Sequence, residues 1–380
     1  MTNKAQHKPS APQRGLDKSL MAAALLLPLA IVPAHAESAP EKTTISYKYL
    51  DYLDSQPDAD RIAVKAHAFA LTLPISDKWS LSATAVNDAV SGASPQYHTK
   101  ELTHMKDVRR GYSLGATRYL PSGTLTVTGN YSGESDYISR SLSATGTWFT
   151  DDTKNTALTA GLGVTRDVIN PNNQAVVGET KNVNDVMVGV TQVFTPVDIV
   201  QVNLRHSNGN GYFSDPYKFL DERPRERNVS TLLTRWNHHF SSVDGTLRSS
   251  YRYYTDTYKV KAHTFGFEYA QALGTGWTVT PLVRLHSQTA AWFYTPYNPD
   301  PDYGITLPTG PITSQDQRLS AFGALTTGVK VSRQLTPALL VDVKYEYYRQ
   351  RSEWARGNQG DPGLAPFNAK SLQLGFSYQF

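Results

Sequence analysis

Charged side chains recur at every second position in several strand-length stretches of the chain. In the stretch 340–347, Asp342, Lys344 and Glu346 alternate with the apolar residue Val343 and the aromatic Tyr345. Because the side chains of a strand point alternately to its two faces, the three charges share one face. Charges along the wall of a water-filled pore bias its ion selectivity. The pattern predicts either such a selective wall or a polar lumen whose charges only bind water and one another.

Five arginines are expected on the same inward surface, in strand-length stretches with apolar residues on the opposite face. They are Arg205, Arg235, Arg248, Arg252 and Arg284. A packed sandwich would bury these charges at a large free-energy cost, whereas a wide barrel with a wet lumen keeps them hydrated. A guanidinium stays charged at every relevant pH and presents fixed donors to anions. We therefore expect a mild anion preference, which Asp342 and Glu346 partly offset.

The segment 204–209 is a candidate for hydrolase chemistry. His206 and Ser207 precede Asn208 and Gly209, and the segment is similar to the arrangement in outer-membrane phospholipases, where a His and a Ser share one barrel face. Adjacent residues of a strand point to opposite faces, so His206 cannot take a proton from Ser207. We expect no enzymatic activity.

Two loops contain residue types that bind metal ions. The candidates in the first loop are His98, Glu101, His104 and Asp107. The second loop offers oxygen ligands from Asn298, Asp300 and Asp302, but no calcium-loop pattern surrounds them. The chain has no cysteine, which excludes thiolate metal sites and disulfides. We interpret both loops as solvated and expect no metal and no cofactor.

About sixteen segments have the length and the alternation of transmembrane strands. Their expected cores are 43–52, 61–73, 78–90, 107–119, 123–136, 138–149, 155–168, 182–194, 198–208, 229–240, 245–257, 259–271, 276–288, 317–333, 339–350 and 370–380. Even strand numbers are typical of bacterial outer-membrane barrels. The sequence therefore predicts an all-β fold, a transmembrane antiparallel β-barrel of about sixteen strands.

The connections between these segments alternate in length. Short turns follow even-numbered segments, as at 121–123 and 336–338, and two further short connections, near 133–137 and 255–259, are exceptions that fall on the external side. The long connections cover 91–106, 169–181, 209–228, 289–316 and 351–369. Short periplasmic turns and long external loops are typical of this class. We expect the aromatic, proline-rich loop 289–316 to be a lid or plug, and the loop 209–228, with charges of both signs, to brace the rim.

The chain ends in a strand with apolar or aromatic residues at alternate positions, the last of which are Phe376, Tyr378 and Phe380. A soluble edge strand that is apolar to its last residue would invite aggregation. The strand resembles the C-terminal signature of bacterial outer-membrane β-barrels, whose assembly machinery recognises a final aromatic residue. We interpret the three aromatic residues as such an assembly signal.

The N-terminal residues form a segment of another kind. Four basic residues precede an apolar run at 20–32, and Ala34 and Ala36 offer the small side chains that a signal peptidase needs. The run is too short for a membrane helix. We predict a secretory signal peptide at 1–36 and a single barrel domain at 37–380.

Composition supports a membrane barrel and gives no reason to expect a nucleic-acid partner. The formal net charge is +4, but the signal segment carries four basic residues against one acid, so the remainder carries only +1. Tyr, Phe and Trp make up 11% of the chain, and such rings belong where lipid tails meet headgroups. Those beside short turns, which predict an aromatic girdle, are Trp79, Trp148, Phe149, Phe194, Trp236, Phe240, Trp277 and Phe380.

Several short motifs spread over residues 37–380 occur together. They are Tyr47–Tyr52, Ser91–His98, Gly211–Lys218, Arg235–Phe240, Gly245–Tyr254, Asp316–Phe322 and Pro362–Phe367. The combination resembles an uncharacterised family of Gram-negative outer-membrane proteins, catalogued as domain of unknown function thirty-five seventy. The resemblance implies a barrel in the outer membrane. It implies no established activity and supplies no catalytic or binding residues.

These patterns together predict a porin-like channel for small solutes or ions in the outer membrane of a Gram-negative bacterium. The alternative is a non-channel barrel, a binding or scaffold module of an envelope complex with its lumen closed by loops. The expected partners are outer-membrane lipid, the barrel assembly machinery during biogenesis, and small solutes or ions.

Overall fold

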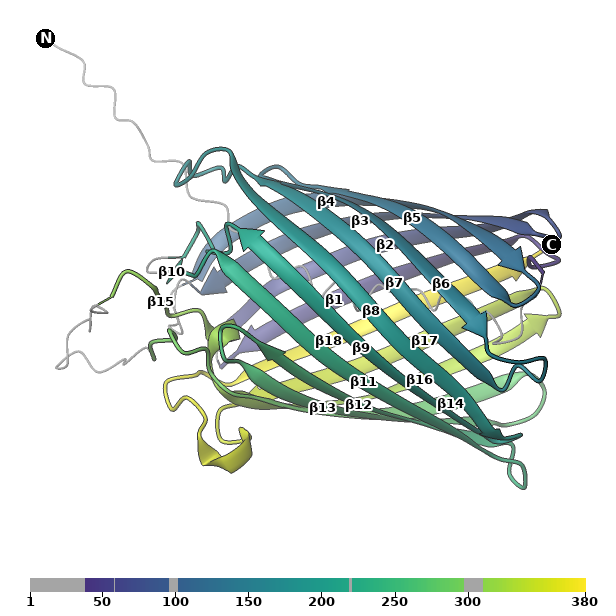
Figure 1. The fold of residues 1–380 in the computed structure, drawn as a ribbon. Coiled ribbons are helices and arrows are strands. Elements are labelled where there is room, and N and C mark those ends of the chain that lie inside the picture. The colour runs from purple at the N-terminus through teal and green to yellow at the C-terminus, as the bar shows by residue number, and fades with distance from the viewer. Residues whose placement is uncertain (1–37, 58, 96–101, 219–220, 297–309) are drawn as a thin grey trace, which may run out of the picture.

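The computed structural model describes residues 38–57, 59–95, 102–218, 221–296 and 310–380. Within these ranges, sixteen strands pair antiparallel around a closed barrel, and β1 at one end of the chain pairs with β18 at the other. The strands run obliquely to the long axis of the barrel (Figure 1). The predicted fold, a closed antiparallel barrel of about sixteen strands, is confirmed.

Each predicted segment has one barrel strand as its counterpart. The strands are β1 (Thr44–Gln56), β2 (Ala59–Ser76), β3 (Trp79–Pro95), β4 (Leu102–Leu120), β5 (Gly123–Gly133), β6 (Tyr137–Phe149), β7 (Thr156–Ile169), β8 (Glu179–Thr195), β9 (Asp198–Gly211), β11 (Glu226–Phe240), β12 (Gly245–Asp256), β13 (Lys261–Ala272), β14 (Trp277–Gln288), β16 (Phe322–Thr336), β17 (Leu339–Arg351) and β18 (Phe367–Gln379). Consecutive barrel strands are neighbours all around the sheet, so the chain winds around the barrel in sequence order.

The largest differences between predicted and observed strand bounds, five residues, occur at two places. β3 and β4 pair as far as Pro95 and Leu102, so part of the predicted loop 91–106 is strand. In contrast, the predicted strand at 317–333 starts later, at Phe322, because a 3-10 turn, η2 (Gln317–Leu319), precedes it. The side chain of Asp316 accepts a hydrogen bond from the backbone N–H of Arg318 and so caps this turn.

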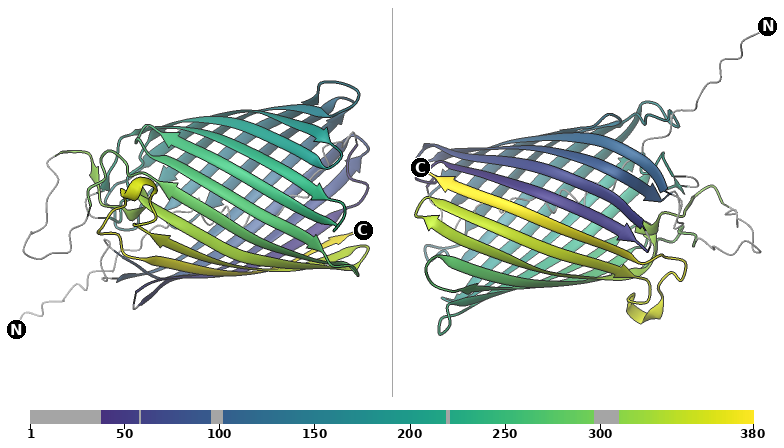
Figure 2. Two further views of the ribbon diagram at one scale, coloured as in Figure 1. Left: turned by 90° about the horizontal axis from the view of Figure 1, so that it is seen from below. Right: turned by 180° about the vertical axis from the view of Figure 1, so that it is seen from behind.

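The long connections carry small elements of their own. β10 (Asp221–Glu222) and β15 (Thr313–Ser314) form a separate two-stranded sheet. A second 3-10 turn, η3 (Arg356–Asn358), lies between β17 and β18. These elements lie at one end of the barrel, whereas the short turns and the C-terminus lie at the other (Figures 1 and 2). We call these ends the long-loop end and the short-turn end.

Alternation along each strand separates two faces. Apolar side chains such as Leu162, Leu204 and Val343 are exposed on the outer wall, as a barrel surrounded by lipid requires. The residues between them form the inner face. An aromatic girdle was predicted at the short-turn end. Its exposed members are Trp79, Trp148, Phe194, Trp236, Phe240, Trp277 and Phe380.

Two girdle tryptophans carry an arginine on their ring faces. The guanidinium carbon of Arg118 lies 5.1 Å from the ring centre of Trp79. That of Arg333 lies 4.8 Å from the ring centre of Trp277. Such cation–π contacts place a positive charge beside an amphipathic ring, an arrangement suited to a headgroup region.

No helix among the described residues is long and apolar enough to cross a membrane. The predicted signal peptide, 1–36, lies outside the described residues.

Candidate pore and its mouth

The inner faces of β14, β16 and β17 carry a chain of paired charges. Lys330 Nζ lies 3.8 Å from a carboxylate oxygen of Asp342. Lys344 Nζ lies 3.2 Å from Glu346, and the guanidinium of Arg284 approaches the same carboxylate at 3.9 Å. The structure therefore brings four of the predicted residues, Arg284, Asp342, Lys344 and Glu346, together on one face, where acid and base offset each other.

Arg205 on β9 and Arg235 on β11 have different partners. The guanidinium of Arg205 lies 2.8 Å from Asp185 on β8, so its charge is neutralised locally. Arg235 donates a hydrogen bond of 3.0 Å to the side-chain oxygen of Gln201, which is uncharged. Among the described residues, no acid therefore offsets the charge of Arg235.

Arg248 and Arg252 lie on the inner face of β12. Arg248 stands across from Glu268 in the β12–β13 register, yet within the described ranges no carboxylate oxygen lies within 4.0 Å of its guanidinium. Arg252 lies 5.7 Å from the ring centre of Tyr254 and likewise has no carboxylate partner in the described part of the chain. Of the five predicted arginines, these two and Arg235 contribute the least compensated charge.

A buried cluster of charges joins the loops at the long-loop end. We call it the mouth cluster, and its members are Lys218, Arg223, Arg318, Asp215, Asp221 and Asp316. The carboxylate of Asp316 lies 3.3 Å from Lys218 and 2.7 Å from Arg223, and it also binds Arg318. Arg223 further contacts Asp221 at 2.9 Å. Three cations and three carboxylates thus balance in a site from which water is largely excluded.

Two further contacts fasten the mouth cluster to the fold. Ser314 on β15 donates a hydrogen bond to Asp221 on β10, its partner in the small sheet. Arg318 also reaches back to Asp215 at 2.8 Å. Segments about a hundred residues apart in the sequence are therefore cross-linked by charge-assisted hydrogen bonds, which are stronger than neutral ones.

An apolar core lies beside the mouth cluster. Its buried residues are Tyr258, Val260, Ala291, Phe293 and Leu319. The rings of Tyr258 and Phe293 meet edge to face with centres 4.9 Å apart. The guanidinium carbon of Arg227 lies 4.6 Å from the ring centre of Tyr258. The loops at this end thus have a packed interior of their own.

Burial and charge act in opposite directions on the carboxyl group of Asp316. Burial alone would raise its pKa, but Arg318, Lys218 and Arg223 outweigh burial and hold the pKa well below its usual range. For Tyr258, burial wins and raises the pKa to about 12, although Arg227 and Arg223 oppose it. Asp316 therefore stays ionised at neutral pH, which the ion pairs of the mouth cluster require.

The structure locates parts of both loops that were expected to act at the rim. In the loop 289–316, Phe293 is buried and Tyr294 donates a hydrogen bond to Asp361 in the β17–β18 connection. Residues 297–309, which include the calcium candidates Asn298, Asp300 and Asp302, lie outside the described residues. In the loop 209–228, Arg225 and Arg227 pair with Glu179 on β8 and Asp256 on β12, at 2.6 and 2.8 Å.

Sequence reasoning did not single out Asp316 or Lys218. Both lie in predicted loops, and their contacts join segments far apart in the chain. A usable signal was present, because the loop 209–228 contains three arginines whereas the loop 289–316 contains three aspartates and no arginine or lysine. That signal does not say which acid meets which base.

In the structure, the histidine of the hydrolase candidate bonds a different serine from the one considered in the sequence. Ser207 faces inward and contacts Asp185, whereas His206 faces outward. His206 instead bonds Ser230 of β11 at 2.9 Å and Asn208 at 3.0 Å. The backbone N–H groups around Ser230 are used in the pairing of β11 with its neighbours β9 and β12. They are therefore not free to stabilise an oxyanion.

The first metal candidate is described only in part. His98, Glu101 and the side chain of His104 lie outside the described residues. Asp107 has two acidic neighbours, Glu134 and Asp136, with one carboxylate oxygen of each residue within 4.8 Å of the others. Neither neighbour was singled out from the sequence. Acidic groups of this kind are common at protein surfaces without an ion.

The three aromatic residues of the predicted assembly signal lie on the outer wall of β18. Phe376, Tyr378 and Phe380 are exposed there. The rings of Tyr378 and Phe380 stack with centres 5.8 Å apart. The backbone of Phe380 exchanges two hydrogen bonds with Thr43, so the last residue helps to close the barrel.

Solved structures similar to this chain are outer-membrane barrels. A bacterial polysaccharide outer membrane secretin has 9% sequence identity and a TM-score of 0.53, covering 89% of this chain and 98% of its own. CymD, a monoaromatic hydrocarbon channel, has 10% identity and a TM-score of 0.46, covering 98% and 94%. OccD3 (OpdP) of Pseudomonas aeruginosa has 9% identity and a TM-score of 0.45, covering 90% and 93%. At such identities the similarity concerns the fold alone.

No curated protein matches the chain. A protein family does match it, over residues 17–180 and 172–380, and these two ranges overlap and together reach the C-terminus. They include the motifs on which the resemblance was based. The chain therefore belongs to the family described as protein of unknown function, DUF3570.

Proposed function

We propose that this protein is a porin-like channel for small solutes or ions. One observation carries the proposal: a closed barrel of sixteen strands bears arginine, lysine, aspartate and glutamate on its inner face. Porin barrels of 16–18 strands leave an aqueous channel. Charges without an ionic partner, such as that of Arg248, require water around them. A wet lumen satisfies both conditions.

The pairing of the wall charges sets the expected selectivity. Arg205 and Asp185 neutralise each other, as do Lys330 and Asp342. Arg248 and Arg252 on β12 have no carboxylate partner among the described residues, so they dominate the field in their part of the lumen. We infer a mild preference for anions, with these two side chains and Arg235, whose partner Gln201 is neutral, as its main source.

The mouth cluster and the adjoining apolar core narrow the entrance at the long-loop end. The loops that carry them lie beyond the ends of β9, β12 and β14 (Figure 1). Because the contacts are buried and charge-balanced, they hold the loops in one arrangement. In this proposal the lumen wall selects solutes and the mouth cluster fixes the width of the entrance.

A second function class uses the same mouth cluster. Tightly joined loops could close the lumen altogether and present a rigid surface to another envelope protein. The buried ion pairs of Asp316 favour this alternative, since a channel needs no cross-linked loops in order to conduct. The two functions differ in conductance, because a scaffold with a closed lumen passes no current.

Reversal potentials in a salt gradient test the wall assignment. We expect the double variant Arg248→Ala with Arg252→Ala to shift the reversal potential toward cations. The shift should shrink at high salt, where the Debye length falls to about 3 Å. An unchanged reversal potential in a conducting variant would contradict the role of these arginines.

A further inference from the structure

The first part of the β17–β18 connection, around Trp354 and Arg356, folds against the outer wall of the barrel. The backbone N–H of Arg356 donates a hydrogen bond of 2.8 Å to Ser287 Oγ on β14. At Gly323 on β16 the loop lies directly on the strand, because a Cβ atom there would come within 2.0 Å of the carbonyl oxygen of Trp354. Any larger residue at 323 would push the connection away from the wall. Because Gly323 has no side chain, the backbone of the connection can lie directly against β16.

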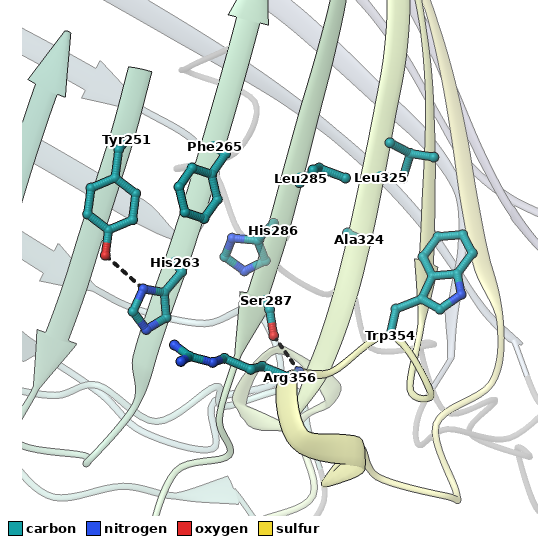
Figure 3. A pocket seen from close by; sticks show the side chains of 10 residues that line it. All are labelled: Tyr251, His263, Phe265, Leu285, His286, Ser287, Ala324, Leu325, Trp354 and Arg356. Carbon is teal, nitrogen blue, oxygen red and sulfur yellow. Dashed lines mark hydrogen bonds between the residues drawn. The ribbon is translucent and has the colours of Figure 1, made fainter. Parts of the chain in front are cut away.

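A hollow of about 690 Å³ lies between this connection and the wall. Its floor is apolar, because Phe265, Leu285 and Leu325 are cross-strand neighbours on β13, β14 and β16. The first two are among the exposed residues of the outer wall. His263 and Arg356 lie at the end of the hollow nearest the connection (Figure 3). The hollow therefore has an apolar part and a polar end.

The polar end offers two unused donors. His263 Nδ1 is bonded to the hydroxyl group of Tyr251 at 2.8 Å, and Nε2 has no hydrogen bond with any residue that the structure describes. When the tyrosine donates to Nδ1, Nε2 carries the proton and is a donor. The guanidinium of Arg356 has neither a hydrogen bond nor an ion pair with any residue of the described ranges. Both groups point into the same space in Figure 3.

The outer wall of the barrel is also basic at this end, on β17 and β18 near the hollow and on β4, β6 and β7 across the barrel. Six cationic residues share the outward face of their strands with exposed apolar residues and lie near the strand ends at the long loops. They are Arg110, Arg140, Arg166, Arg349, Arg351 and Lys370. The guanidinium carbons of Arg349 and Arg351 lie 5.6 and 5.7 Å from the ring centre of Trp354 in the connection. A row of cations just outside an apolar band complements the phosphates of a lipid leaflet.

We propose that the hollow binds a phosphorylated lipid of the leaflet at the long-loop end. Its phosphate accepts hydrogen bonds from Arg356 and His263, and one acyl chain lies along Phe265, Leu285 and Leu325. Arginine binds phosphate through two parallel donors, which fixes orientation as well as charge. Free phosphate would leave the apolar floor unused, and a neutral lipid would leave both donors unused. The site does not depend on whether the barrel conducts.

Native mass spectrometry of the detergent-purified full chain tests the proposal. The probes are a phosphatidic acid, a diacylglycerol with the same chains, and inorganic phosphate. We expect phosphatidic acid to bind at least about tenfold more tightly than the diacylglycerol. Arg356→Gln should lower the affinity for phosphatidic acid about tenfold, the loss expected for one charge-assisted hydrogen bond. Phe265→Ala should weaken the two lipids alike.

Arg118→Gln is the matched control. It removes the same charge from the same outer wall, but at the short-turn end, where Arg118 lies over Trp79. We expect it to leave phosphatidic acid binding unchanged. Equal losses in Arg118→Gln and Arg356→Gln would overturn the site, as would equal binding of phosphatidic acid and diacylglycerol. Displacement of phosphatidic acid by equimolar inorganic phosphate would show an anion site without a lipid and would also overturn the proposal. Migration of the unheated variants as folded barrels on gels separates these outcomes from misfolding.

Discussion

Two ion pairs of the same chemical type lie in very different surroundings in this barrel. Arg205 and Asp185 on the wall approach to 2.8 Å, with 56% and 17% of their side chains exposed. Arg223 and Asp316 at the mouth approach to 2.7 Å, with 9% and 0% exposed. Water and salt screen the first pair, whereas the second would leave an uncompensated buried charge if one partner were lost. The distance between the partners therefore does not tell which of the two pairs contributes more to stability.

The difference separates two tasks. On the wall, the guanidinium of Arg205 remains hydrated, so it acts on solutes through its field and its ion pair adds little to stability. At the mouth, charges are used up in mutual contacts, so they act on the shape of the loops. The same residue types thus tune selectivity in one region and hold structure in the other.

The largest expected effect comes from Asp316→Asn. Removing one partner of a buried cluster leaves Lys218, Arg223 and Arg318 with one carboxylate too few. Local opening of the loops should become easier by about 3–5 kcal/mol. Hydrogen exchange of the amides at 310–321 measures this free energy.

Asp185→Asn on the wall is the matched control for that variant. It makes the same chemical change to the acid of an exposed pair, so we expect a cost of about 0–1 kcal/mol. Equal costs for the two variants would remove the distinction between wall and mouth.

The facing of the wall residues is tested by neighbouring substitutions. Val343→Arg places a charge on the lipid-facing wall and should cost about 2–4 kcal/mol of unfolding free energy near the bilayer midplane. Lys344→Ala, one residue away on the inner face, should cost far less. Urea unfolding from lipid vesicles measures both. A harmless Val343→Arg with a severe Lys344→Ala would mean that the strand is shifted by one residue.

The ion pairs of the mouth cluster should persist to a lower pH than the pKa of an ordinary aspartate would allow. The pKa of Asp316 is lowered, so its contribution to stability is fully present above the unfolded value of about 3.9. This contribution is lost as the pH falls through the lower, folded pKa. Pepsin should therefore spare residues 289–296 at about pH 4 and cleave them only in stronger acid. In Asp316→Asn the same segment should be cut at both pH values, and cleavage of the wild type at the higher pH would contradict the account.

The smallest expected effect is that of removing a neutral pair from the wall. Arg205→Ala combined with Asp185→Ala deletes one positive and one negative charge that face each other. The unfolding free energy should change by about 0–1 kcal/mol, and the reversal potential should stay where it is. A clear shift in this double variant would show that paired wall charges act individually on passing ions.

Much of the barrel could be predicted from the alternation of apolar and polar residues at every second position. Alternation at Asp342, Val343 and Lys344 separates the faces of β17 without any knowledge of its neighbours. The C-terminal strand could be identified by its aromatic alternation, and its partner β1 follows because a barrel must close. The number of strands could be estimated from the strand-length segments and from the lengths of the connections between them.

Contacts between distant segments could not be predicted. Whether Arg205 meets Asp185, or Arg248 meets Glu268, depends on the register of neighbouring strands and on rotamers, which alternation does not specify. Asp316 and Lys218 lie 98 positions apart, in loops whose packing follows no period. The hollow at Arg356 depends on Gly323, whose role becomes visible only when the loop lies on it.

Single-channel recording in planar bilayers tests the central claim most directly. The wild-type full chain should open with discrete steps and a mild anion preference, and Asp316→Asn should conduct at least as well, because its loops are loosened. A current that appears only in Asp316→Asn, or only without residues 289–316, would identify the loops as a plug. Silence in the wild type and in both loop variants would contradict the channel and would leave the scaffold function in its place.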